Sequence, residues 1–131
     1  MTTSLSAFQL EILKQARSDM LSFAWIESEA RDMLAETDAK ARLLSACHSI
    51  VDLAESGLVV LGSVDFNSNE ALLCVNPYPV PMTQLRSHIC QLVDSRIQRG
   101  VTNNNFFSIT DEDAWLEISQ TGRWVSSRFH T

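Results

Sequence analysis

The densest group of residues that could do chemistry in this sequence is a late cluster of acids. Asp111, Glu112 and Asp113 are consecutive, and Glu117 follows four positions after the last of them. Paired carboxylates can serve as general acid and base, and clustered carboxylates can bind a divalent cation. Acids at successive positions of a turn more often form a solvated loop, and no residue with a complementary catalytic role accompanies them. The cluster therefore predicts a charged surface rather than a catalytic centre.

Cysteine and histidine lack the spacing of a metal site. Cys47 and His48 are adjacent and His88 and Cys90 are two apart, so the members of each pair would point in different directions on a helix. With Cys74, the three cysteines are an odd number without a CxxC motif, which is not a disulfide framework. We expect small buried thiols in a reduced cytoplasm, and neither a metal nor another cofactor.

Motifs that activate a nucleophile or hold a phosphate are missing from the sequence as well. It has no GxSxG, and its four glycines form neither GxxxxGK[ST] nor GxGxxG. A serine or cysteine nucleophile also needs a base and a group that orients the base. We therefore predict that the protein is not an enzyme.

Length and composition indicate that residues 1–131 form one folded domain. The chain is 45% hydrophobic and 20% charged, which suits a globule rather than a disordered tail. Its longest apolar runs, 58–61 and 71–75, are far shorter than the roughly 20 residues that span a membrane. The N-terminal segment lacks the charge and apolar pattern of a secretory signal. No membrane partner is expected.

Hydrophobic periodicity predicts three helices in the first half of the chain. The first follows a capping box formed by Ser6 and Gln9, and the second spans about residues 22–36. The third begins after Thr37 or Asp38 and carries the clearest apolar stripe before a glycine ends it.

The pattern changes after the third helix. Apolar runs at 58–61 and 71–75 flank a turn-rich stretch, which predicts a β-hairpin. Prolines at every second position then force an extended connector at residues 76–82. Beyond it we expect a helix capped by Thr83 and ended by Gly100, short strands at 106–109 and 114–118, and a closing helix at 120–129.

The predicted fold is α+β: a helical core with a hairpin at 1–75, the connector at 76–82, and a helix, strands and a terminal helix at 83–131. Three helices followed by a hairpin is the order of a winged helix-turn-helix domain. Residues 49–59 resemble the end of a recognition helix that runs through a glycine into the wing. Residues 115–123 resemble the aromatic-x-Leu-Thr-x-x-Gly-Arg phrase of that family, with Ile-Ser in place of Leu-Thr. The layout is also similar to that of uncharacterised small bacterial proteins.

This resemblance implies a DNA-binding transcriptional regulator that acts through the polar face of the third helix. The candidate residues opposite its apolar stripe are Lys40, Arg42, Ser45, His48 and Ser49. Lysine and arginine could pair with phosphate, and arginine could read guanine. However, Asp52 and Glu55 balance the two bases of residues 40–60, and residues 1–39 hold three bases against seven acids. DNA binding is therefore the alternative prediction.

The leading prediction is a non-enzymatic protein-binding module that occupies a basic partner. The formal charge is -6, and charge complementarity speeds association and suppresses wrong partners. Proteins that process nucleic acids are basic where they hold phosphate, so an acidic immunity-type or inhibitor protein could block such a surface. The candidate acids are Asp111, Glu112, Asp113, Glu117, Glu27, Glu29 and Asp32. Trp25, Tyr78 and Trp124 are candidate apolar anchors if they are exposed.

The helix expected at 83–99 is the basic exception in the chain. It carries three arginines, Arg86, Arg96 and Arg99, and one acid, Asp94, which gives a local charge of +2. Such a helix could pair with the acidic region of a second copy, so a homodimer is a further expectation.

Overall fold

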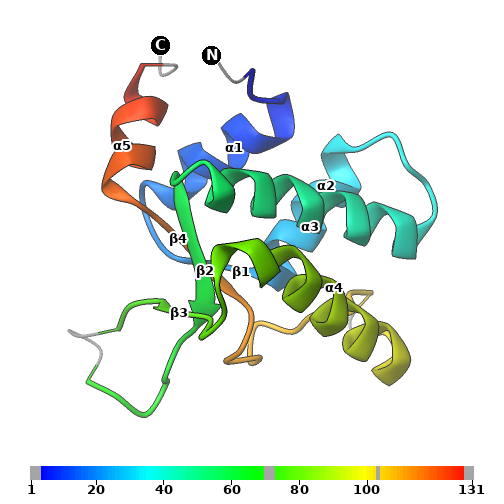
Figure 1. Ribbon diagram of the computed structural model, residues 1–131. Coiled ribbons are helices and arrows are strands. Elements are labelled where there is room, and N and C mark those ends of the chain that lie inside the picture. The colour runs from blue at the N-terminus through cyan, green and yellow to red at the C-terminus, as the bar shows by residue number, and fades with distance from the viewer. Residues whose placement is uncertain (1–3, 70–72, 103, 129–131) are drawn as a thin grey trace.

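Five helices pack around a four-stranded antiparallel sheet in the computed structural model of the protein, which describes residues 4–69, 73–102 and 104–128 (Figure 1). In chain order the elements are α1 (Ala7–Ala16), β1 (Leu21–Ser22), α2 (Phe23–Met33), α3 (Ala39–Glu55), β2 (Val59–Ser63), β3 (Asn76–Pro77), α4 (Met82–Arg99), β4 (Trp115–Ile118) and α5 (Gln120–Ser127). The fold class is α+β, as the sequence predicts. Within the described ranges, no helix has both the length and the apolar character needed to cross a membrane.

The sheet joins strands from distant parts of the chain in the order β1-β4-β2-β3, and each neighbouring pair is antiparallel. Leu116 of β4 is paired with Leu21 of β1 on one side and with Leu61 of β2 on the other. Because side chains directly opposite each other point to the same face, these three leucines lie together, and all are buried. This face of the sheet forms part of the core.

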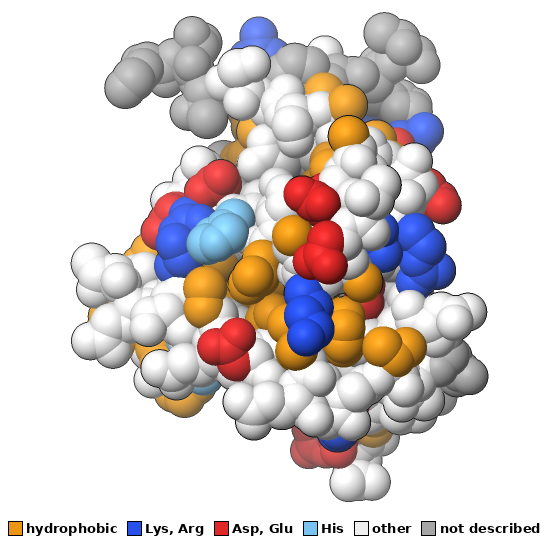
Figure 2. Space-filling model, turned by 90° about the vertical axis from the view of Figure 1, so that its right-hand side faces the viewer, with side chains coloured by type: hydrophobic (Ala, Val, Ile, Leu, Met, Phe, Trp, Pro, Cys, Tyr) orange, Lys and Arg blue, Asp and Glu red, His pale blue; other side chains and the backbone are white. Residues whose placement is uncertain are grey.

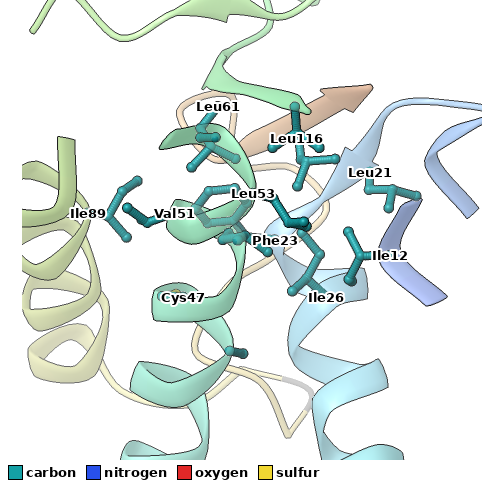
Figure 3. Packing of buried hydrophobic residues seen from close by; sticks show 14 of the residues in the cluster. Ile12, Leu21, Phe23, Ile26, Cys47, Val51, Leu53, Leu61, Ile89 and Leu116 are labelled. Carbon is teal, nitrogen blue, oxygen red and sulfur yellow. The ribbon is translucent and has the colours of Figure 1, made fainter. Parts of the chain in front are cut away.

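The helix α3 passes through the centre of the core. It packs against α1, α2, α4 and β2. Figure 3 shows Val51 of α3 next to Ile89 of α4, while Ile12 of α1 and Ile26 of α2 lie on the other side of α3. The predicted apolar stripe of this helix is confirmed, with Leu44 partly buried and with Leu43, Cys47, Ile50, Val51 and Ala54 buried.

Three predicted helix caps are confirmed. Ser6 and Gln9 form a reciprocal capping box at the start of α1. At the start of α3, the side chain of Asp38 accepts a hydrogen bond from the N–H of Ala41 at 2.9 Å. After α3, Gly57 has a φ of 78°, in the left-handed region that glycine adopts without steric cost.

The second strand of the predicted hairpin is misplaced. Ala71 and Leu72 lie outside the described residues, and residues 73–75 form no strand. The pairing strand is β3, inside the proline-rich segment predicted as a connector, and it pairs with the end of β2. A Cβ on Gly62 would lie 1.8 Å from the carbonyl oxygen of Asn76. Glycine at this position therefore lets β3 approach β2.

Two further sequence predictions are wrong. The helix α4 begins at Met82 with Pro81 as its N-cap, so Thr83 lies within the helix. The proline lacks an N–H and has φ fixed at -62°, which suits the entrance to a helix. Residues 106–109 form no strand, because the carboxylate of Glu27 takes the N–H groups of Phe106 and Phe107.

Candidate partner-binding surface

The late acidic cluster lies against the end of α4 and is neutralised there. The Nε of Arg96 donates to Oδ2 of Asp111 at 3.4 Å, and the same guanidinium also pairs with Asp113. Arg99 pairs with Asp111 at 3.2 Å. The side chains of Arg96 and Asp111 are only 12% and 11% exposed. Cations of the same chain therefore engage two of the acids that the sequence assigns to a partner.

The arginines of α4 form ion pairs with acids of the same chain. The homodimer prediction depends on pairing this helix with the acidic region of a second copy. Arg86 instead pairs with Asp52 at 2.6 Å and with Glu55 at 2.7 Å, and Arg96 and Arg99 pair with the late cluster. These contacts remove the charge argument for a homodimer.

Asp111 is held as an ionised carboxylate. Partial burial acts to raise its pKa, but the hydrogen bond from the Ser108 N–H and the charges of Arg96 and Arg99 outweigh that effect. The pKa of Asp111 therefore lies below its ordinary value of 3.8. Its carbonyl also accepts the indole N–H of Trp115 at 2.7 Å. Asp111 is thus a structural residue that ties its loop to α4 and β4.

Glu112 and Glu117 hold the segment that follows β2. Glu112 accepts the N–H of Phe66 at 3.0 Å, and Glu117 accepts the N–H of Val75 at 2.8 Å. Glu112 is exposed, whereas Glu117 is partly buried. Both carboxylates therefore have a structural use, and the late cluster is not a free acidic surface.

Glu27 is buried, which corrects its assignment to a partner-binding surface. It is 6% exposed, and its two carboxylate oxygens accept the N–H groups of Phe106 at 2.8 Å and Phe107 at 3.0 Å. Desolvation by burial raises the pKa of Glu27, against the opposing effect of these hydrogen bonds. The carboxylate fastens the segment before β4 onto α2 and is closed to a partner.

The remaining two acids, Glu29 and Asp32, lie on one side of α2 with Trp25, which is partly buried and also packs against the core. Positions 25, 29 and 32 follow the four- and seven-residue spacing that places side chains on one side of a helix. The buried residues of this helix occupy its other side and are Phe23, Ala24, Ile26, Glu27 and Ala30. Asp32 is exposed, and Trp25 and Glu29 are partly exposed. We call the surface formed by Trp25, Glu29 and Asp32 the α2 face.

The α2 face is negatively charged and uncompensated. Desolvation raises the pKa of Glu29, and the like charges of Glu11 on α1 and of Asp32 raise it further. In the part of the chain that the structure describes, none of these three acids joins an ion pair. Arg31, next to Asp32 in the sequence, points its guanidinium at residues 104–105 instead. The result is a group of like charges held near one another.

A hollow of about 280 Å³ opens beside Trp25. One wall comes from α2 and the other from residues 102, 105 and 107–109, and none of the described residues that line it carries a charge. Phe107 lies at its base as part of the core, whereas Ile109 is 68% exposed at its edge. An uncharged recess, lined by apolar residues and by serine, threonine and asparagine, therefore adjoins the Trp25 end of the α2 face.

The DNA-binding candidates lie on α3 in different environments. Lys40, Ser45 and His48 are exposed, and Arg42 and Ser49 are partly buried. Arg42 donates to backbone carbonyls of the segment before α3. The carbonyl of Ser49 accepts a hydrogen bond from a side chain of α1. The five residues thus do not form one free polar surface.

His48 belongs to a network of mixed charge between α3 and α4. Its Nδ1 lies 2.8 Å from the guanidinium of Arg86, which also pairs with Asp52 and Glu55. On the face in Figure 2, acidic, basic and histidine side chains lie next to one another. A phosphate approaching this region would meet carboxylates as well as cations.

The three candidate aromatic anchors differ in accessibility. Trp124 is 61% exposed on α5, and its ring lies under the guanidinium of Arg128. Trp25 is partly buried. Tyr78 is also partly buried, and its hydroxyl donates to the carbonyl of Asp113. Trp25 is the anchor that adjoins uncompensated acids.

The three cysteines are free thiols that differ in accessibility. Burial raises the pKa of the Cys47 thiol far above its ordinary value, so this residue is a neutral core side chain. Cys90 is partly buried, but Cys74 is exposed, contrary to the prediction of buried thiols. Among the described residues, no three His, Cys, Asp or Glu side chains come together as metal ligands would.

No family model matches this chain, and neither a curated protein nor a solved structure was found to be similar to it. The α2 face itself is therefore the basis for a functional inference. Its helical spacing is visible in the sequence, and both of its acids are among the predicted ones. Glu11 and the hollow were missed, because the packing of α1 and of residues 104–109 beside α2 is a tertiary feature.

Proposed function

We propose that this protein is a non-enzymatic protein-binding module whose α2 face binds a basic segment of a partner protein. The observation that carries the proposal is that Glu29 and Asp32, on the same side of α2 as Trp25, repel each other and the nearby Glu11 and join no ion pair among the described residues. The acids around α4, in contrast, are paired with arginines. Like charges held near one another reduce stability, so neutralising them on binding is favourable.

The chemistry of the α2 face suits a partner rich in lysine and arginine. Exposed carboxylates attract a basic surface over a distance of about 8 Å at physiological ionic strength and speed its association. Trp25 adds an aromatic side chain, a residue type that often dominates binding energy at the centre of an interface. Charge would thus select the partner and the aromatic residue would supply affinity.

The finer proposal is an immunity-type or inhibitor protein that occupies a nucleic-acid-processing partner. Such a partner is basic where it holds phosphate. The carboxylates of Glu29 and Asp32, less than one helical turn apart along α2, would take the place of phosphates on that surface. A protein bound there blocks the nucleic acid without any chemical step of its own.

DNA binding through α3 is the alternative, and fewer observations support it. His48 stands in a network with Asp52 and Glu55, and Arg42 is engaged by backbone carbonyls. Random-sequence duplex DNA at low salt is the appropriate probe, because non-specific affinity is strongest there. Strong, salt-sensitive binding that Lys40→Ala and Arg42→Ala weaken would favour the alternative.

Charge reversal on the α2 face tests the proposed function. A Glu29→Lys/Asp32→Lys variant is compared with wild type and with Asp94→Lys, which reverses an exposed acid on α4. We expect wild type and the Asp94 variant to co-purify a basic protein from native cells in stoichiometric amount, and the double variant to lose it. Retention by the double variant, or no specific protein with any of the three, contradicts the proposal.

A further inference from the structure

We infer that the segment bound by the α2 face is a basic amphipathic helix, with one apolar side chain in the hollow beside Trp25 and basic side chains against Glu29 and Asp32. This inference rests on the proposed function and names the kind of partner it requires. The inference combines two features on either side of Trp25. One is an uncharged recess at one end of α2, and the other is the pair of acids without an ion-pair partner further along the same helix.

The recess fits a side chain better than a free small molecule. Its volume of about 280 Å³ lies just below the roughly 300–1,000 Å³ typical of small-molecule sites. Its described lining has no charged residue that would fix a polar ligand, and Trp25 and Ile109 offer apolar contact. An aliphatic or aromatic side chain of a partner satisfies this chemistry.

The wall of the recess is already in place before any partner arrives. The side chain of Asn105 donates to Ser28 Oγ at 3.1 Å and to the Ala24 carbonyl at 3.3 Å, both on α2. Glu27 and Arg31 hold the neighbouring residues of the same segment. Since these bonds fix the segment to α2, a ligand would not need to order it, which favours affinity.

The spacing along α2 determines the shape of the partner. Glu29 is four residues from Trp25 and Asp32 is seven, or about 6 Å and about 10.5 Å along the helix axis. A second helix lying along α2 has the same rise per residue. Its apolar residue and basic residues four and seven positions away would therefore meet all three side chains, as helices do in grooves. Charge complementarity specifies lysine or arginine at those two positions.

A designed peptide tests this inference. The probe is an alanine-rich helical peptide of about 18 residues, with one leucine and with lysines four and seven positions from it. Three matched peptides replace the leucine by serine, replace both lysines by glutamine, or place a proline between leucine and lysines to prevent the helix. Affinity is measured by calorimetry at low salt. The indole N–H signals of Trp25 and Trp124 are followed by NMR and assigned with single tryptophan variants.

We expect the parent peptide to bind and to shift the Trp25 signal but not that of Trp124. Each of the three changes should weaken binding by at least about tenfold. On the protein, Ile109→Ser at the edge of the recess should weaken the parent peptide. Val101→Ser, at a site 57% exposed that does not line the recess, should not.

Failure of this inference is distinguishable from failure of the proposed function. Equal binding of the leucine and serine peptides, or of the helical and proline peptides, overturns the amphipathic helix. No binding of any peptide overturns it as well. The charge-reversal experiment in native cells would still decide the proposed function in either case.

Discussion

Arg96 and Asp111 form an ion pair in which both side chains are almost removed from solvent. They lie 15 positions apart and join α4 to the loop before β4. A buried charge without its partner is strongly unfavourable, so the folded state needs both of these residues. This pair explains why the most acidic stretch of the sequence is a structural element of the fold.

Replacing Arg96 by alanine should lower the free energy of unfolding by about 2–4 kcal/mol, because it leaves the carboxylate of Asp111 partly uncompensated in a nearly buried site. Arg99→Ala is the matched control. Its side chain is 54% exposed, so we expect a loss of no more than about 1 kcal/mol. Urea unfolding measures both, and equal losses would contradict the structural role of Arg96.

Asp111 should make the protein sensitive to acid. Its folded pKa is below the ordinary value of 3.8, so the unfolded chain takes up the proton first as the pH falls. The stability that Asp111 contributes is complete above that value and is lost as the pH falls through the folded pKa. Asp111→Asn should be less stable than wild type at neutral pH and lose less stability below pH 3.8. Parallel curves of stability against pH would refute this.

Glu27 should act in the opposite direction. Its folded pKa is raised above 4.5, so the native state binds the proton more tightly than the unfolded chain. The wild type should therefore lose stability as the pH rises from 4.5 through the folded pKa. Glu27→Gln should lack this decline and should be less stable at neutral pH by about 1–3 kcal/mol, because its amide can accept only one of two buried N–H groups. Unchanged hydrogen exchange at Phe106 and Phe107 would contradict it.

Alanine at Gly62 should detach β3 from β2. The added Cβ would lie 1.8 Å from the carbonyl oxygen of Asn76. Because the Cβ and the carbonyl are each attached directly to a main chain and cannot rotate away, one strand must shift. We expect a loss of about 1–3 kcal/mol and faster amide exchange at Tyr78, whose N–H donates to Leu61. Gly57→Ala is the comparison: no atom lies within 4 Å, so only its left-handed φ is strained and Tyr78 exchange should not change.

Glu29→Gln should stabilise the isolated protein slightly, by about 0.2–0.5 kcal/mol, because it relieves repulsion from Glu11 and Asp32. The gain should shrink as salt is added. Thermal unfolding at low and high ionic strength is the measurement. Under the proposed function the same substitution weakens partner binding, so the acids of the α2 face would be retained for binding at the expense of stability.

Local features of the fold could be predicted from the sequence because they depend on neighbouring residues. The capping box of Ser6 and Gln9, the cap at Asp38 and the turn at Gly57 each involve positions within one helical turn. That Glu29 and Asp32 lie on the same side of α2 could be predicted in the same way, since it follows from their spacing and from helix geometry.

Long-range contacts could not be predicted from residue type. Glu27 looks like any surface glutamate in the sequence, yet its acceptor role depends on Phe106, which lies 79 positions away. The same is true of Asp111 and Asp113, whose charge is cancelled only when the loop returns to α4. Burial and pairing, rather than composition, decide which acids remain available to a partner.

The sheet order also determines when the protein can fold during synthesis. Leu21 of β1 pairs with Leu116 of β4, 95 positions later by subtraction. At about 5–20 residues per second, a ribosome needs about 5–20 s to pass from one to the other. Until β4 emerges, β1 and β2 have no strand between them. A ribosome stalled before β4 would therefore display a chain that cannot yet form its native sheet, because the strand that joins β1 to β2 is the last of the four to be made.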